Sequence, residues 1–143
     1  MPSKLRRPAD VALPPEGWNS IRASFDLTGL TAPEASGVLL QWALSRHVGA
    51  EIVRAGYPTK KDFATRNSLS IDRVRNFFNG HRRANFEDLA YFIEVLGPEA
   101  WPDPERLAAY IDGARRRSED SALEGPFPSL YRHDGPGAHR SGG

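Results

Sequence analysis

The stretch of residues 59–83, TKKDFATRNSLSIDRVRNFFNGHRR, constrains the fold of this chain most. Its apolar spacing predicts two short helices, at about 60–67 and 71–79, with a tight turn between them. Ser70 can accept hydrogen bonds from the free N–H groups that begin the second helix. Gly80 suits the left-handed residue that often follows a helix. The segment is therefore expected to be a compact helical hairpin.

The side chains of the second predicted helix divide into two faces. Val74, Phe77 and Phe78 follow the i, i+3, i+4 spacing of one apolar stripe. In the first helix Phe63 and Ala64 point inward, and the small Ala64 lets the second helix cross closely. The opposite arc of the second helix is polar and carries Asp72, Arg75, Asn76 and Asn79, with Arg73 at its edge.

This pattern resembles, without a gap over residues 59–80, the helix-turn-helix of the lambda repressor and Cro family, also called the XRE family. Agreement lies at the family's aliphatic-Ala pair, its hydrophobic-Ser/Thr turn, its two core positions and its closing Asn-Gly, which are here Phe63-Ala64, Leu69-Ser70, Val74 with Phe77, and Asn79-Gly80. One position departs, since the family usually has Gly in the turn where this chain has Ser68. The neighbouring Asn67 could adopt the left-handed conformation instead.

The resemblance extends over residues 39–97 and implies an all-α, lambda-repressor-like bundle of about five helices. The alternative is an ordinary helical hairpin in an all-α core. Charge separates the two interpretations. Residues 54–83 contain eight Lys and Arg side chains against two Asp, a net charge of +6, whereas the whole chain carries only +1. A surface that neutralises phosphates has this single-sign concentration.

The rest of the chain sets the domain boundaries. Residues 1–18 are Pro-rich and predict a flexible basic arm, residues 19–117 a helical DNA-binding domain with its helix-turn-helix at 59–80, and residues 118–143 a disordered tail. Further helices are expected from a capping box at Thr31–Glu34 to Arg54, from 86 to 96 behind an Asn85 cap with Asp88 as its partner, and from 104 to 117.

The buried faces of these helices follow from their periodicity. In the long helix we expect the buried residues to be Val38, Trp42, Leu44, Val48, Ile52 and Val53. In the helix at 86–96 they are Phe86, Leu89, Ala90, Phe92, Ile93 and Leu96, and in the last helix Leu107, Ile111 and Ala114, with Trp101 beneath that helix. His47 falls on the polar side of the long helix and is expected at the surface.

Residues 19–28 have the alternation of a half-buried strand, with Ile21, Ala23, Phe25 and Leu27 apolar. Three structures would satisfy the pattern: a strand paired with its copy in a homodimer, an extended segment packed on the helices, or a short helix. A lone strand gains ladder hydrogen bonds from its symmetry mate, so we expect a homodimer with this segment at the interface. The alternative is a monomer in which the segment covers the helices.

Composition excludes several classes of site. The chain has no cysteine, so neither disulfides nor thiolate metal sites are expected. His133 and His139 have no partners at ligand spacing, and we predict no metal and no cofactor. No signal peptide or membrane span is evident, so a cytoplasmic location without membrane contact is expected. No nucleophile with a base and no Gly-rich phosphate loop can be proposed, so the chain is not expected to be an enzyme.

The predicted function is a sequence-specific regulator of transcription that binds double-stranded DNA, a repressor of phage or mobile-element type. By position in the family, the base-reading candidates are Ile71, Asp72, Arg75 and Asn76, with Arg73 beside them. The phosphate-binding candidates are Thr59, Lys60, Lys61, Ser70, Asn79, His81, Arg82 and Arg83. Two alternatives are an antitoxin-like protein-interaction module that also binds DNA, and a non-specific nucleic-acid-binding protein.

Overall fold

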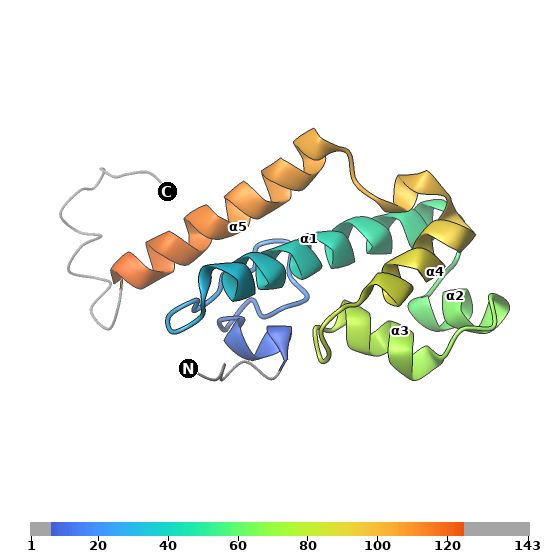
Figure 1. Cartoon of the computed structure of the whole chain (residues 1–143), viewed down its shortest axis with the longest axis horizontal. Helices are drawn as coiled ribbons and strands as arrows, with labels where there is room; N and C mark the ends of the chain where they lie inside the picture. Colours follow the sequence, from blue (N-terminus) through green and yellow to red (C-terminus); the bar gives the residue numbers. More distant parts are fainter. Residues whose placement is uncertain (1–6, 125–143) are drawn as a thin grey trace.

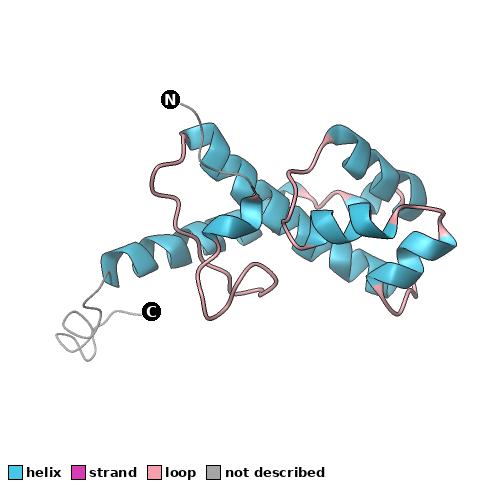
Figure 2. Cartoon of the chain, turned by 90° about the horizontal axis from the view of Figure 1, so that it is seen from below, coloured by secondary structure: helices cyan, strands magenta, loops and turns pink. Residues whose placement is uncertain are grey.

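The computed structural model describes residues 7–124, and every regular element in that range is helical (Figures 1 and 2). The helices are α1 (Ala32–Arg54), α2 (Lys60–Arg66), α3 (Ile71–Phe78), α4 (Phe86–Leu96) and α5 (Pro104–Glu124), with short 3₁₀ helices η1 (Pro8–Val11) and η2 (Pro98–Ala100). The all-α class with five α-helices is therefore confirmed for the described part of the chain.

Helix α1 lies at the centre, with α5 along one side and α2, α3 and α4 on the other (Figure 1). Thr31 and Glu34 form the expected capping box at its start, and the helix runs through Gly37 without a break. Two apolar clusters form on α1. Leu44, Val48 and Ile52 pack against the buried side chains of α2, α3 and α4. Trp42 and its neighbours pack against α5 and against residues 7–31, which precede α1 and are called the N-terminal segment below.

The helices α3 and α4 are capped as their sequences predict. Ser70 Oγ accepts a hydrogen bond from Arg73 N at 3.2 Å, and Asn85 and Asp88 form a capping box at α4. Phe63, Ala64, Val74, Phe77 and Phe78 are all buried. In the turn, Ser68 itself adopts the left-handed conformation, with φ 57°. Asn67 has φ −111°, so it does not supply the left-handed residue. Its side-chain amide donates instead to Phe63 O at 2.8 Å and to the Tyr57 hydroxyl.

The N-terminal segment differs from the prediction of a flexible arm over residues 1–18. Residues 1–6 lie outside the described residues, but from Arg7 onward the chain is packed, and Pro8 and Trp18 are buried. The reason is a set of long-range contacts, since Ala9 N donates to Gly80 O at 2.9 Å and Trp18 reaches the end of α3. The local pattern of a Pro-rich sequence does not predict contacts between residues so far apart in the chain.

The alternating segment at 19–28 is an extended segment packed on the helices, the second of the three expected outcomes. Ala23 and Phe25 are buried, while Ile21 is exposed. Its only bridge in the described chain pairs Phe25 with Ala12. Its polar groups are bonded within the chain, for Asp26 N donates to Val11 O and Phe25 N donates to Ser118 Oγ. The reason for a dimer through this segment is therefore lost.

Other predictions of burial were wrong. Phe86 is 90% exposed, and Ala90, Ile93 and Val53 are exposed as well. In α4 the inward face is turned toward Asp88 and Phe92. His47 is 6% exposed, because η2 covers it and places Glu99 O 2.8 Å from its Nε2. Trp101, which was predicted beneath the last helix, is 43% exposed.

The last helix is longer than expected. The chain continues as helix to Glu124, not 117, and Ser118 is buried where its hydroxyl bonds Ala114 O and the 19–28 segment. The predicted tail at 118–143 thus begins in ordered helix, and residues 125–143 lie outside the described residues. None of the helices in residues 7–124 has the length and apolar character needed to span a membrane.

Candidate nucleic-acid interface

The polar arc of α3 is accessible to a partner. Asp72 and Arg75 are exposed, and Asn76 and Asn79 are half-buried at the margin of the arc. Ile71 is half-buried too and packs against the apolar cluster under α3. Of the five predicted base-reading residues, three therefore project from one surface, and Ile71 belongs partly to the core.

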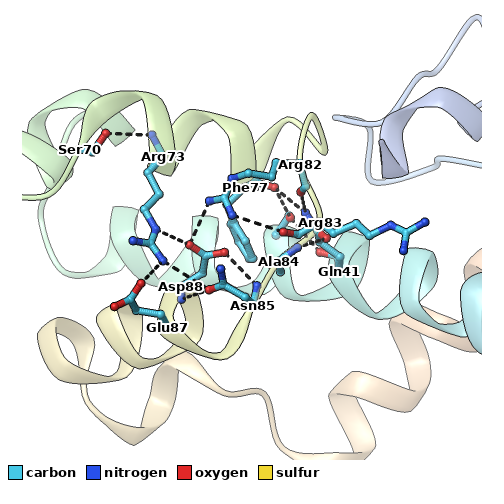
Figure 3. A network of polar contacts seen from close by, with 11 residues as sticks. Gln41, Ser70, Arg73, Phe77, Arg82, Arg83, Ala84, Asn85, Glu87 and Asp88 are labelled. Atoms are coloured by element: carbon cyan, nitrogen blue, oxygen red, sulfur yellow. Dashed lines mark hydrogen bonds and ion pairs between the residues drawn. The ribbon is translucent and has the colours of Figure 1, made fainter. Parts of the chain in front are cut away.

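Arg73, the fifth candidate, is held by other side chains of the protein (Figure 3). Its Nε donates to Asp88 Oδ1 at 2.7 Å and its Nη2 to Glu87 Oε1 at 2.7 Å. Its guanidinium also stacks on Tyr91, 5.1 Å from the ring centre. The hydrogen bonds to Asp88 and Glu87 raise the pKa of Arg73 above its usual value. Arg73 thus joins α3 to α4 and is not directed into the polar arc.

Asp88 is the acceptor at the centre of this network (Figure 3). Its side chain is 2% exposed and also accepts from Arg82 Nη2 at 3.1 Å and from Asn85 N at 3.0 Å. Burial by itself raises the pKa of a carboxyl group, but the hydrogen bonds from Arg73, Asn85 and Arg82 outweigh it and the pKa of Asp88 is lowered. The aspartate is consequently charged, and it orients Arg73 of α3 and Arg82 of the loop that follows α3.

Hydrogen bonds to the side chain of Gln41, on α1, hold the backbone of the loop after α3 (Figure 3). The buried amide donates to Phe77 O at 3.2 Å and to Arg82 O at 2.9 Å, and its oxygen accepts from Ala84 N at 2.8 Å. One side chain thereby satisfies three backbone groups that a loop would otherwise leave unpaired. The basic loop that carries His81, Arg82 and Arg83 has a defined path as a result.

The C-terminal end of α3 is closed by the N-terminal segment. Trp18 Nε1 donates to Phe78 O at 2.8 Å, which satisfies one of the free carbonyls at the end of the helix. Gly80 has φ 67°, and a Cβ there would lie 2.6 Å from the Trp18 ring. Glycine is thus required at this position for two reasons, the positive φ and the close approach of the Trp18 ring. No local pattern in the sequence signals this contact, which joins residues 60 positions apart.

The phosphate-binding candidates surround the arc but have different tasks. The hydroxyls of Thr59 and Ser70 cap α2 and α3 by accepting from Asp62 N and Arg73 N. Arg82 shares Asp88 with Arg73. Lys61, His81 and Arg83 are exposed. Lys60 lies with its ammonium group 5.0 Å from the centre of the Phe78 ring, and burial, followed by the charge of Arg46, lowers its pKa.

The positive charge of residues 54–83 is partly neutralised. Arg54 pairs with Glu51 at 2.7 Å, and Arg73 and Arg82 pair with Glu87 and Asp88. No carboxylate in the described part of the chain lies within 4.0 Å of the cationic groups that remain on Lys60, Lys61, Arg66 and Arg75. These four charges are available to an anionic partner.

No protein-family model, curated protein or solved structure matches this chain. In residues 7–124 no group of three His, Asp or Glu side chains is arranged to hold a metal ion. What the geometry offers is a rigid, exposed polar helix face with cations around it.

Proposed function

We propose that this protein is a sequence-specific, double-stranded-DNA-binding regulator of transcription that uses α2 and α3 as a helix-turn-helix. The observation that carries the proposal is the exposed arc of α3, with Arg75 and Asn76 on a helix that is fixed at both ends. The major groove admits a helix, and its base edges can be told apart by hydrogen bonding.

The readers proposed are Asp72, Arg75 and Asn76. An arginine can bind guanine through two hydrogen bonds, and an asparagine can bind adenine in the same way. Asp72 can accept from cytosine N4 or orient Arg75. Ile71 contributes packing, together with any contact to a thymine methyl group. Arg73 is no longer included, because its guanidinium is used by Asp88, Glu87 and Tyr91.

The proposed phosphate contacts come from Lys60, Lys61, Asn79, His81, Arg82 and Arg83, with Thr59 and Ser70 at the starts of α2 and α3. Such contacts position the protein without reading sequence. A repressor of phage or mobile-element type is the form of regulator that we propose.

The proposal is tested by selecting bound duplexes from a random-sequence DNA pool. We expect recovery of one short motif, in which positions respond separately to changes of Arg75 and of Asn76. The symmetry of the motif would also report how many copies bind. Recovery of no motif, with equal binding of all duplexes, would favour the non-specific alternative, and no binding at all would refute the proposal.

A second candidate function is binding to a protein partner, as an antitoxin does. The observation that favours it is the exposed apolar line on α4, where Phe86, Ala90 and Ile93 lie at i, i+4 and i+7. Exposed apolar lines of this kind often mark contacts with other proteins. A stoichiometric complex that is lost on Phe86→Ser would support this candidate, whereas DNA binding that is unaffected by Phe86→Ser would separate it from the first.

A further inference from the structure

Two cations lie close together where α1 passes the start of α2 and the end of α3. Lys60 is the first residue of α2, and its ammonium group lies over Phe78 of α3. The Lys60 side chain also runs along Gly49 of α1, with Cε 3.9 Å from the place where a Cβ on Gly49 would stand. Arg46 precedes Gly49 by one helical turn and therefore lies on the same side of α1.

Arg46 is held from the N-terminal side. Its Nη1 donates to Asn19 O, and its Nη2 lies 3.4 Å from Asn19 Oδ1. Asn19 directly follows Trp18, which closes the end of α3. The Nε of Arg46 is buried and has no hydrogen-bond partner. The guanidinium is thus oriented by the segment that also fixes α3.

Neither cation is neutralised within the described residues. No carboxylate there lies within 4.0 Å of the Arg46 or Lys60 cationic groups. Burial lowers the pKa of Arg46, with Tyr110 acting in the opposite sense. Burial also lowers the pKa of Lys60, and the nearby charge of Arg46 lowers it further. Two partly desolvated like charges are unfavourable together, and an anion between them would relieve both.

Arg46 and Lys60 lie on one side of the polar arc of α3, the side on which Phe78 lies. At 3.6 residues per turn, Phe78 and Arg73 lie about 110° to either side of the centre of the arc. Lys60 covers Phe78, and Arg82 meets Arg73 at Asp88. Cations therefore flank the arc on both sides. A helix in the major groove has a phosphate strand on each side in the same way.

We propose that Arg46 and Lys60 together bind one phosphate of the DNA backbone, on the side of α3 opposite Arg82. This inference rests on the proposed function and adds a residue of α1, Arg46, that the sequence pattern does not identify. Arg46 supplies directed N–H donors and Lys60 a point charge, a combination that suits a tetrahedral anion. Because one phosphate serves both residues, their contributions to counterion release overlap.

The test is the salt dependence of binding, measured by fluorescence anisotropy with a duplex that carries the selected motif. The variants are Arg46→Gln, Lys60→Gln and the double variant, with Arg106→Gln as the matched control. Arg106 is an exposed arginine of α5, on the other side of α1 from α3 (Figure 1). Each single change leaves one cation at the phosphate and should reduce the slope of log affinity against log salt by less than about 0.9, whereas the double variant, which leaves none, should reduce it by about 0.9. The control should leave the slope unchanged.

A measurement on the DNA keeps the test independent of how the variants fold. Phosphates of the duplex are replaced one at a time by neutral methylphosphonate. One position should weaken binding of the wild type and have no effect on the double variant, while Arg46→Lys, which keeps the charge, should retain most of the wild-type slope. A double variant whose slope equals that of the wild type, or single losses of about 0.9 each that add to about 1.8 in the double variant, would overturn the shared site. A wild type that binds no duplex would instead refute the proposed function itself.

Discussion

At the scale of single residues, neighbouring arginines of α3 have separate roles. Arg73 lies in a network with Glu87, Asp88 and Tyr91, whereas Arg75 is exposed and has no carboxylate partner in the described chain. Two positions along a helix correspond to a rotation of about 200°, which places the two guanidiniums on opposite sides. The structural role of one and the proposed reading role of the other follow from that rotation.

Replacement of either Arg75 or Asn76 by Ala should reduce affinity for the selected duplex by about 1–3 kcal/mol and relax preference at one base pair. Neither side chain is a core residue, so the free energy of unfolding should change little. Anisotropy on a panel of single-base variants of the duplex measures the preference. An unchanged base preference in Arg75→Ala would show that the reading face has been chosen wrongly.

Asp88→Asn should destabilise the fold by about 1–3 kcal/mol at pH 7, because the hydrogen bonds from Arg73 and Arg82 lose their charged acceptor. The pKa of Asp88 is lower in the folded than in the unfolded protein, where it is about 3.9. Its stabilisation is therefore present above about pH 4 and is lost as the pH falls through the lower folded value. Urea unfolding at pH 7 and pH 3 should show the difference between wild type and variant shrinking in acid; a constant difference would contradict this.

Phe86 and Phe92 are about 1.7 turns apart in α4 and should respond in opposite ways to truncation. Phe92 is buried among Phe63, Phe77 and Phe78, so Phe92→Ala should cost about 3–5 kcal/mol. Phe86 is 90% exposed, and Phe86→Ser should change stability by less than about 0.5 kcal/mol. Thermal unfolding of the two variants compares them directly, and a large loss in Phe86→Ser would mean that this side chain is covered.

At the scale of elements, the caps of α1, α3 and α4 and the buried faces of α2 and α3 could be predicted because local residues determine them. Thr31, Ser70 and Asn85 each bond a backbone N–H within their own first turn. The face of α4 was predicted less well, since Phe86 and Ile93 satisfy the same helical period as Phe92 and only the neighbouring helices decide which residues are covered.

The contacts of the N-terminal segment with α3 and the loop after it could not be predicted from the sequence. Trp18 closes α3 and Ala9 bonds Gly80, but neither residue carries a local signal for a partner 60 or more positions away. The same holds for Arg46, whose place beside Lys60 depends on how α1 and α2 meet. The sequence could therefore name candidate residues within positions 59–83, but not the contributions of α1 and of the N-terminal segment.

Gly80→Ala should destabilise the protein by more than the cost of a left-handed residue alone, which is about 1–2 kcal/mol. The added methyl group would meet the Trp18 ring as well. Trp18→Phe removes the hydrogen bond to Phe78 O but keeps an aromatic ring, and should cost about 1 kcal/mol. Urea unfolding of both variants measures these losses. An unaltered stability in Gly80→Ala would mean that the segment does not pack on α3 in solution.

At the scale of the whole molecule, α1 separates two apolar clusters with different tasks. One supports α2, α3 and α4 and so the proposed reading surface, while the other joins α5 to the N-terminal segment. The connection between them is Trp18, which belongs to the second cluster and caps α3 of the first. Because of this connection, the orientation of α3 depends on the whole described chain and not on the α2–α3 pair alone.

The central claim, that α3 reads DNA sequence, is tested most directly by comparing the Kd for the selected duplex with the Kd for a shuffled duplex of the same composition at one physiological salt concentration. The account predicts a ratio of at least about 10³, as specific DNA-binding proteins show, and a smaller ratio for Arg75→Ala. Equal dissociation constants for the two duplexes, or a ratio that Arg75→Ala leaves unchanged, would contradict it.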